Sequence, residues 1–375
     1  MSEYQYYGWQ AIDRPLTAAE RAAVAKLSSH IEVSATHAQV EYQWGDFKHD
    51  PIQVLARYFD AFQYYANWGN ERLAFRFPKS LLDADRLKPY LWTDCAELQT
   101  VGDYYILSFA SPEEEPPEWD EHGDDLADLA ALRNDILQGD LRSLYLASLL
   151  GIVTNLYLDN DEGEAEAELE PSVPPGLGQL TPALEAFIRF MRIDPFLVAA
   201  AAEASAPLAA ASSASLAATI AQLPRAECDA FLQRLLQGEA NLQVVLQRRL
   251  QELAGASTPA APDAAPRRTI GVLLARADEL QRTAAARAKA AAEAKRIQEL
   301  QAFAPQAARA WQTVEDEIGR KNASGYDNAV QLLVKLRDLA VYQGELPLFK
   351  ARIATLVDRY KSQRSFVERV GKVKL

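Results

Sequence analysis

Aromatic residues are concentrated at one end of the chain, and no other sequence feature limits its fold as strongly. Twenty of the 34 phenylalanine, tyrosine and tryptophan residues lie between Tyr4 and Phe109. Each such side chain can bury roughly 150–250 Å², so this segment can build a large hydrophobic core. Beyond Ser111 the sequence changes to acidic stretches and alanine-rich helical patterns. We therefore predict a compact domain over residues 1–110 and a remainder that is built differently.

The apolar pattern within residues 1–110 predicts several strands. Alternating or β-branched residues are typical of half-buried strands, and glycine-containing pairs between them are typical of turns. The expected strands cover 4–12, 31–44 as one long or bent strand, 73–77, and a hairpin over 96–109 that turns at Gly102-Asp103. These strands predict a sheet.

Two capping patterns predict helices between these strands. Thr17, followed by Glu20 three residues later, forms a capping box, and Asp50-Pro51 combines an N-cap with a proline suited to the first turn. The apolar residues expected on the second helix are Leu55, Tyr58, Phe59, Phe62 and Tyr65, with the turn at 67–70 ending it. We expect the helices to cover one face of the sheet.

The rest of the chain is expected to be mainly α-helical, with linkers between the helical parts. The expected segments are 1–110 (α+β domain), 111–125 (acidic linker), 126–158 (helical hairpin), 159–178 (acidic linker), 179–254 (helical module), 255–266 (Pro/Ala linker) and 267–375 (basic long helix plus helical pair). Ala304-Pro305 should divide the long helix, and the helical pair should turn at Gly344. The predicted fold class is α+β: a sheet domain followed by helical modules.

Charge is distributed unevenly along the chain. The net charge is −13, but residues 267–375 carry +9 and residues 1–266 carry −22. The basic helix that starts near Arg267 could follow a phosphate backbone. Its arginines and lysines alternate with acidic residues and no aromatic residues lie between them, so a solvated helix with internal ion pairs is the simpler interpretation.

Several function classes lack their usual signatures. No window approaches the apolar length of a membrane-spanning helix, and the first residues do not resemble a signal peptide, so we expect a cytoplasmic protein. Cys95 and Cys228 are too few for a disulfide framework or a cysteine-based zinc site, and inert thiols are expected. Phosphate-binding loops, dinucleotide fingerprints and hydrolase or metalloprotease motifs are absent. We predict no cofactor and no catalytic residue.

The candidate binding residues lie in or beside two Trp-Gly turns and on the strand expected after the second turn. They are Trp44, Asp46, Lys48, His49, Trp68, Arg72 and Arg76. Trp44 and Trp68, with Lys48 nearby, could stack on a base or bind a peptide. A structural role, in which both tryptophans fill the edge of the hydrophobic core, explains them as well. Arg72 and Arg76 share one strand face and could bind an anion, an acidic peptide or the acidic stretch 113–121, or could simply be solvated.

One cluster has the residue types of a metal site. His37, Glu41, Asp46 and His49 are the members, and the first two would share a strand face. Their spacing matches no known ligand pattern, so we predict no metal. An enzyme with a site around His37, Trp44, Asp46, His49 and Arg76 remains an alternative.

Two stretches resemble known families. Residues 6–16 (YYGWQAIDRPL), together with Trp44-Gly45-Asp46-Phe47, resemble an uncharacterised bacterial protein family, over about a quarter of the chain. This resemblance implies no active site. Residues 326–330 (YDNAV) through 365–369 (SFVER) resemble the helical C-terminal tails of some bacterial SWIM zinc-finger proteins. The finger's cysteines and histidine have no counterpart here, so this resemblance implies a helical protein-docking module without zinc.

Together these features predict a non-enzymatic adaptor or scaffold protein in a bacterial cytosolic complex, with its protein partner bound through the C-terminal helices. One alternative is a nucleic-acid-associated accessory protein that uses residues 267–375. A second alternative is an enzyme with a site near the loop from Trp44 to His49. No membrane association is expected.

Overall fold

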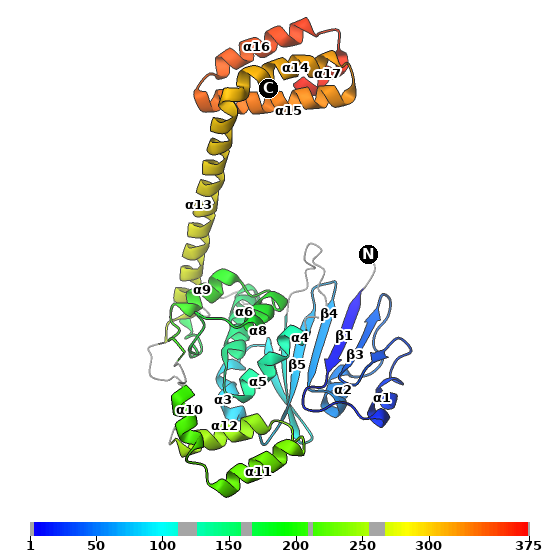
Figure 1. The fold of residues 1–375 in the computed structure, drawn as a ribbon, viewed down its shortest axis with the longest axis vertical. Helices are drawn as coiled ribbons and strands as arrows, with labels where there is room; N and C mark the ends of the chain where they lie inside the picture. The colour runs from blue at the N-terminus through cyan, green and yellow to red at the C-terminus, as the bar shows by residue number, and fades with distance from the viewer. Residues whose placement is uncertain (1–3, 112–125, 159–166, 209–212, 255–266, 374–375) are drawn as a thin grey trace. The chain divides into compact units, whose positions relative to one another are not determined.

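The structure is a computed structural model that describes residues 4–111, 126–158, 167–208, 213–254 and 267–373. The chain divides into two compact units, residues 1–281 and 282–375, which we call the N-terminal and C-terminal units (Figure 1). The N-terminal unit contains an antiparallel sheet and most of the helices, and the C-terminal unit is helical. The predicted α+β class is confirmed.

The sheet has seven strands in the order β2-β3-β1-β4-β5-β7-β6, and each pair of neighbours is antiparallel. The strands are β1 (Gln5–Gln10), β2 (Glu32–Val33), β3 (His37–Tyr42), β4 (Ala61–Ala66), β5 (Glu71–Pro78), β6 (Ala96–Val101) and β7 (Tyr104–Ala110). The hairpin of β6 and β7 turns at Gly102, where φ is +56°, as the sequence predicts.

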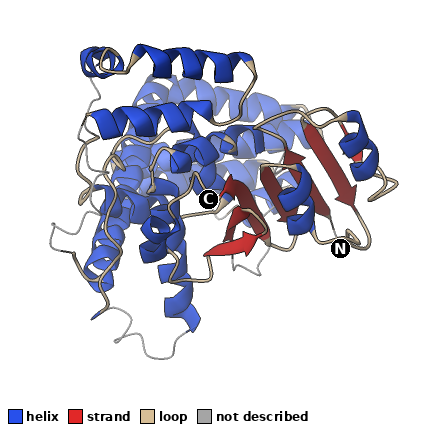
Figure 2. Ribbon diagram, turned by 90° about the horizontal axis from the view of Figure 1, so that it is seen from below, coloured by secondary structure: helices blue, strands red, loops and turns tan. Residues whose placement is uncertain are grey.

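Helices cover both faces of the sheet, not one as expected from the sequence (Figure 2). On one face, Trp9 and Phe62 pack with α1 (Ala18–Val24) and α2 (Pro51–Tyr58). On the other face, Phe75 and Phe109 pack with helices from the middle of the chain. Because side chains alternate across a strand, β4 and β5 are buried on both sides.

β4 begins where the sequence predicted that the second helix would continue. The helix ends at Tyr58, and Phe59 is extended, with φ −127° and ψ 173°. Phe62 and Tyr65 therefore lie on a strand, and 67–70 is a hairpin turn between β4 and β5. The apolar spacing 55, 59, 62 fits a helix, but the buried Asp60 stops it, because its carboxylate accepts hydrogen bonds from the amides of residues 12 and 13.

The long strand predicted over 31–44 is a short hairpin instead. Ser34 lies between β2 and β3, and its hydroxyl oxygen accepts hydrogen bonds from the amides of Thr36 (3.3 Å) and His37 (2.9 Å). Serine side chains that bind the backbone two or three residues on stabilise turns. This local turn, which alternation alone does not reveal, folds β2 back on β3.

The remaining helices of the N-terminal unit share one core with the sheet, except the two within residues 213–236, which contribute no described side chain to it. They are α3 (Ala84–Leu87), α4 (Leu126–Leu129), α5 (Ala131–Leu137), α6 (Arg142–Leu158), α8 (Pro182–Phe190), α9 (Pro195–Ala202), α10 (Ser213–Ile220), α11 (Arg225–Leu236) and α12 (Leu242–Leu253), with a 3-10 turn at Lys88–Tyr90. Phe109 of the sheet lies 5.0 Å, centroid to centroid, from Phe187 of α8. The expected linker 111–125 lies, apart from Ser111, outside the described residues.

The described end of the second expected linker is part of this core. Glu170 is buried and pairs with Arg268 at 2.7 Å, and Tyr145 of α6 donates a hydrogen bond to the same carboxylate. Leu177 is also buried. The acidic composition of this stretch predicted a solvated linker, but one glutamate is neutralised by an arginine that lies 98 residues away in sequence.

The C-terminal unit is built from helices around its own apolar core. The helices are α13 (Ile270–Phe303), which begins in the N-terminal unit, then a 3-10 turn (Ala304–Gln306), α14 (Ala307–Gly319), α15 (Ala323–Gln343), α16 (Leu346–Arg359) and α17 (Arg364–Lys372). Ile318, Leu333 and Phe366 are fully buried in this core. The division at Pro305 and the helical pair around Gly344, where φ is +73°, are confirmed.

Among the described helices, no single one is both long and apolar enough to cross a membrane. The segments Leu126–Leu137 and Arg142–Thr154 meet that test only when taken together, and a bend of 109° separates them.

Candidate functional site

A cavity of about 320 Å³ opens on the sheet face that carries α2. Four strands and the loop before α2 contribute to its wall. Its lining residues are Tyr7, Phe47, Pro51, Phe62, Tyr64, Asn70, Glu71, Arg72, Ala110 and Ser111. We call it the aromatic cavity. Of the residues singled out from the sequence, Arg72 lies directly in its wall.

Strand register brings the aromatic wall together. Tyr7 of β1 is paired with Tyr64 of β4, and their ring centroids are 4.9 Å apart. Phe47 joins them from the loop, 5.5 Å from Tyr7. The loop turns at Gly45, whose φ of +88° is accessible to glycine at little cost. Trp9, which packs on Phe47 and Phe62, supports the wall from below.

A hydrogen-bond network orients the two tyrosines. The hydroxyls of Tyr7 and Tyr64 both donate to Gln5 Oε1, at 2.7 and 3.0 Å. Gln5 Nε2 in turn donates to Asp46 Oδ1 at 2.7 Å and to the Gly45 carbonyl at 3.0 Å. Burial raises the pKa of both phenols, and the negative charge of Asp46 adds to the effect. The tyrosines therefore stay neutral, and Asp46 acts on the cavity through Gln5.

Arg72 reaches the cavity from β5, where it pairs with Tyr64 on one side and Ala110 on the other. It donates a long hydrogen bond of 3.4 Å to Ser108 Oγ. Its Nε is buried and has no acceptor among the residues that the structure describes. The guanidinium is thus a half-buried cation in an aromatic wall.

Arg76, four residues along the same strand face, belongs to a buried ion-pair network instead. Its Nη2 lies 2.7 Å from Asp60 Oδ1, and its Nη1 donates to a carbonyl of α2. Arg133 of α5 makes two hydrogen bonds to Asp13, at 2.7 and 2.9 Å, and lies 3.8 Å from Asp60. Burial alone would raise the pKa of Asp60, but Arg133, Arg76 and backbone amides together lower it. This network ties α5 to the sheet.

The other residues singled out from the sequence lie around the loop and the β4–β5 turn. Trp44 is 71% exposed, and Lys48 and His49 are exposed as well. His49 packs edge-on against Phe47, with ring centroids 5.6 Å apart. Trp68 is half-buried in the turn between β4 and β5. The structure therefore places Arg72 in the wall of the aromatic cavity, links Asp46 to that wall through Gln5, and places Arg76 in the ion-pair network.

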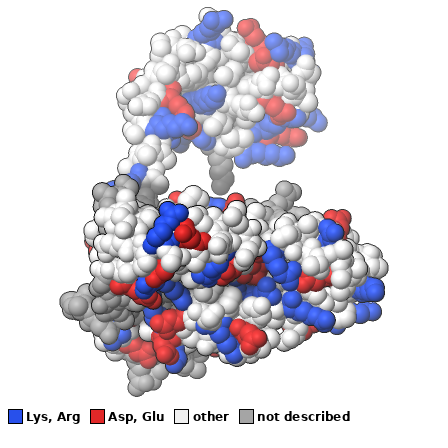
Figure 3. All heavy atoms as spheres, turned by 60° about the horizontal axis from the view of Figure 1, so that its bottom comes forward, with Lys and Arg blue, Asp and Glu red and all other residues white. Residues whose placement is uncertain are grey.

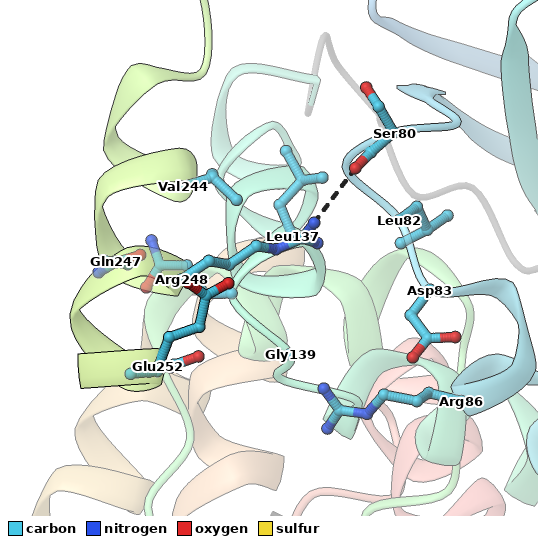
Figure 4. Close-up of a pocket in the computed structure, with 12 residues that line it drawn as sticks. Ser80, Leu82, Asp83, Arg86, Leu137, Gly139, Val244, Gln247, Arg248 and Glu252 are labelled. Atoms are coloured by element: carbon cyan, nitrogen blue, oxygen red, sulfur yellow. Dashed lines mark hydrogen bonds between the residues drawn. The ribbon is translucent and has the colours of Figure 1, made fainter. Parts of the chain in front are cut away.

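A second, larger cleft of about 380 Å³ lies between α12, the start of α3 and the loop after α5. Figure 4 shows Arg248 of α12 reaching across to the Ser80 carbonyl, to which it donates at 3.3 Å, and Arg86 directed toward Gly139. Asp83 and Glu252 also line this cleft. Charges of both signs face it, so it favours no single class of ligand.

Neither an activated thiol nor a cluster of metal ligands is found among the described residues. Burial raises the pKa of the Cys95 thiol to about 11, which disfavours the thiolate needed for nucleophilic attack. Within the described residues, no three His, Cys, Asp or Glu side chains converge as a metal site would require. The aromatic cavity instead combines a cation with apolar rings, an arrangement suited to binding.

Sequence reasoning identified Arg72 but missed the residues that surround it. Tyr7, Tyr64 and Ser111 are distant in sequence, and they meet only because β1, β4, β5 and β7 lie side by side in the sheet. Tyr7 and Tyr64 each show strand alternation, but the strand order is needed to pair them.

The chain matches no protein-family model, and no curated protein or solved structure is significantly similar to it. The two family resemblances seen in the sequence therefore stay predictions, and the function must be argued from the residues themselves.

Proposed function

We propose that the protein is a non-enzymatic adaptor or scaffold of the bacterial cytosol that binds a protein partner through its C-terminal helices. The observation that carries this proposal is a group of apolar side chains exposed where α15 ends and α16 begins. Val341 is 50% exposed, Tyr342 41% and Leu348 69%, and all three lie close in sequence to the turn at Gly344. The Tyr342 hydroxyl accepts a hydrogen bond from Gln301 of α13, so its ring is the apolar part that it contributes. We call Val341, Tyr342 and Leu348 the α15–α16 apolar surface.

This surface is not needed to complete the unit's own core. On the same two helices Leu339 and Phe349 are buried, and the core extends through α14, α15, α16 and α17. Leaving a large apolar side chain in water forgoes about 1.5–3 kcal/mol relative to burial. Clustered exposed apolar residues often mark protein-binding surfaces, and an adaptor needs such a surface on a stable module.

A scaffold requires more than one binding surface, and α11 supplies a second apolar one. Leu232, Leu235 and Leu236 are spaced at i, i+3 and i+4, so they share one side of the helix. All three are exposed, Leu236 by 88%, and α11 has no buried residue. An amphipathic helix that buries none of its leucines is suited to packing against another protein.

The proposal is tested by affinity purification of the full-length protein from its native cells. We expect a stoichiometric protein partner that survives nuclease and is lost from the double variant Val341→Gln, Leu348→Gln. The matched control is Val272→Gln, which alters an exposed valine on α13 (56% exposed) in the N-terminal unit. Recovery of the same partner by the double variant would show that the partner does not bind through the α15–α16 apolar surface, which would contradict the proposal.

The nucleic-acid alternative has weaker support. Arg276 pairs with Glu203 and Glu279, and Arg296 pairs with Glu293 on the same helix. On the C-terminal unit, the view in Figure 3 shows basic and acidic side chains interspersed. Ion-paired arginines offer less charge to a phosphate backbone. A set of partners that disappears with nuclease would favour this alternative over the adaptor.

A further inference from the structure

Of the two arginines on one strand face, Arg76 has a counter-charge and Arg72 has none among the described residues. Arg76 has the carboxylate of Asp60 at 2.7 Å, and Arg192, elsewhere in the unit, has that of Glu71. Arg72 has no carboxylate within ion-pair distance among the residues that the structure describes, and its buried Nε has no acceptor there. Removing a guanidinium from water without a counter-charge is unfavourable. Arg72 is therefore available to pair with an anion that enters the cavity.

A second donor lies in the same wall. Ser111 is buried, and its Oγ has no hydrogen-bond partner in the described part of the chain. The Ser111 amide donates to the Glu71 carbonyl at 3.0 Å, which holds the residue beside β5. The one acidic side chain of the lining, Glu71, is paired with Arg192. Apart from the paired Glu71 and the exposed Asn70, the polar part of the cavity presents a cation and a hydroxyl, which suit the two oxygens of a carboxylate.

The rest of the wall is apolar and held in place. Phe47, Phe62 and Pro51 contribute carbon surface. Tyr7 and Tyr64 have already committed their hydroxyls to Gln5, so they offer ring surface to a ligand. Because burial raises their pKa values, no phenolate competes with a bound anion for Arg72. A flat apolar group can pack against such rings by stacking or edge contacts.

We propose that the aromatic cavity binds an aromatic carboxylate, with the carboxylate against Arg72 and Ser111 and the ring against Tyr7, Phe47 and Tyr64. A volume of about 320 Å³ is at the small end for ligand pockets, which suits one ring and a short acid chain. A free aromatic acid and the C-terminal aromatic residue of a peptide present this same chemistry. The site is separate from the α15–α16 apolar surface, so neither proposal depends on the other.

The first test compares an acid with its uncharged analogue on the full-length protein. Isothermal titration at pH 7 uses 3-phenylpropionate and 3-phenylpropionamide, which differ only in the group expected to meet Arg72. We expect the acid to bind at least about tenfold more tightly, since hydrogen bonds to charged groups are the stronger ones. Equal binding of acid and amide, or no binding of the acid at millimolar concentration, would overturn the proposal.

The second test assigns the binding to the cavity. Arg72→Gln should weaken binding of the acid by about 10–100-fold and leave binding of the amide unchanged. The matched control is Arg57→Gln, an exposed arginine on α2, which should bind like the wild type. If Arg72→Gln does not fold, Tyr64→Leu tests the ring contact by weakening both probes. Binding of the acid by a folded Arg72→Gln variant at wild-type affinity would contradict the assignment.

The third measurement identifies the source of the carboxylate. The tripeptide Ala-Ala-Phe is titrated with a free and with an amidated C-terminus. A free peptide that binds more tightly than 3-phenylpropionate identifies a peptide C-terminus as the ligand, and a free peptide that binds more weakly identifies a small acid. Both results support the site. A peptide whose amidated form binds as tightly as its free form would speak against a carboxylate ligand.

Discussion

The two units place their charged side chains differently. The N-terminal unit has ion pairs in its interior as well as at its surface: the side chains of Asp60 and Arg133 are 1% and 2% exposed, whereas those of Asp85 and Lys88 are well exposed. In the C-terminal unit, each described ion pair keeps at least one side chain well exposed, as in the pair of Arg359 and Glu315. Its core is apolar, around residues such as Leu333.

This difference indicates two ways in which a fold can hold a binding surface in place, with buried ion pairs or with an apolar core. Buried ion pairs tolerate few arrangements, because an unpaired charge inside a protein is strongly unfavourable. In the N-terminal unit the buried ion pairs connect strand β5, the β1–α1 turn and α5. Arg72, on the same strand, belongs to none of the described pairs and lines the aromatic cavity. The C-terminal unit forms its core mainly with apolar contacts, and its described ion pairs lie at or near the surface, where they can vary with a partner.

Removing a buried carboxylate should have the largest effect. Asp60→Ala leaves Arg76 and Arg133 without a shared counter-charge and should lower the free energy of unfolding of the N-terminal unit by about 3–5 kcal/mol. Urea unfolding followed by tryptophan fluorescence measures this in a Trp311→Phe background, where the remaining tryptophans belong to that unit. The control Asp85→Ala removes an exposed carboxylate. A loss below about 1 kcal/mol for Asp60→Ala would mean that the network is not stabilising.

An apolar truncation should have a similar or slightly smaller effect in the other unit. Leu333→Ala removes a fully buried side chain and should cost about 2–5 kcal/mol. Hydrogen exchange of amides in α14 to α17 measures the loss, and the exposed Leu348→Ala serves as the control. Unchanged protection in Leu333→Ala would show that this core is not tightly packed.

The contribution of Asp60 should depend on pH. Its pKa in the folded protein lies below its ordinary value of 3.8. Its ionised form therefore stabilises the fold above that value, and this contribution disappears as pH falls through the folded pKa. Replacing it by asparagine should thus cost most at pH 7 and progressively less below about pH 4. Urea unfolding of wild type and Asp60→Asn at pH 7, 5, 4 and 3 measures the difference. If the loss in free energy of unfolding caused by Asp60→Asn stays constant or grows as pH falls, the ionised carboxylate is not what stabilises the fold.

The smallest effect is expected for a surface ion pair. Arg359→Gln removes the ion pair with Glu315, in which both side chains are well exposed. This change should alter the free energy of unfolding by less than about 1 kcal/mol. Hydrogen exchange of α16 measures it. A loss comparable to that of Leu333→Ala would erase the contrast between the two units.

Local sequence signals predicted much of the fold. The capping box at Thr17, the hairpin turn at Gly102 and the division at Pro305 are each set by residues within a few positions. β4 could not be predicted this way, because its sequence Ala-Phe-Gln-Tyr-Tyr-Ala is apolar on both faces and continues the spacing of α2. A strand buried on both sides has no alternation to reveal it.

The candidate site was predicted only in part, for the same physical reason. The sequence shows that Arg72 and Arg76 share a strand face, but not that Asp60 neutralises Arg76 and also lies 3.8 Å from Arg133. Asp60 lies just before β4 and Arg133 lies on α5, so they meet only when the strands are ordered and the helix is packed. The aromatic wall of Tyr7 and Tyr64 likewise depends on the pairing of β1 with β4.

The most direct test of the contrast is hydrogen–deuterium exchange of the full-length protein, read by mass spectrometry, for Asp60→Ala and Leu333→Ala side by side. We expect Asp60→Ala to accelerate exchange in β1, β4, β5 and α5 while α14 to α17 keep wild-type protection. Leu333→Ala should show the reverse pattern. If either variant accelerates exchange throughout the chain, the two units are not stabilised separately, and the contrast between a unit that depends on buried ion pairs and a unit that does not is wrong.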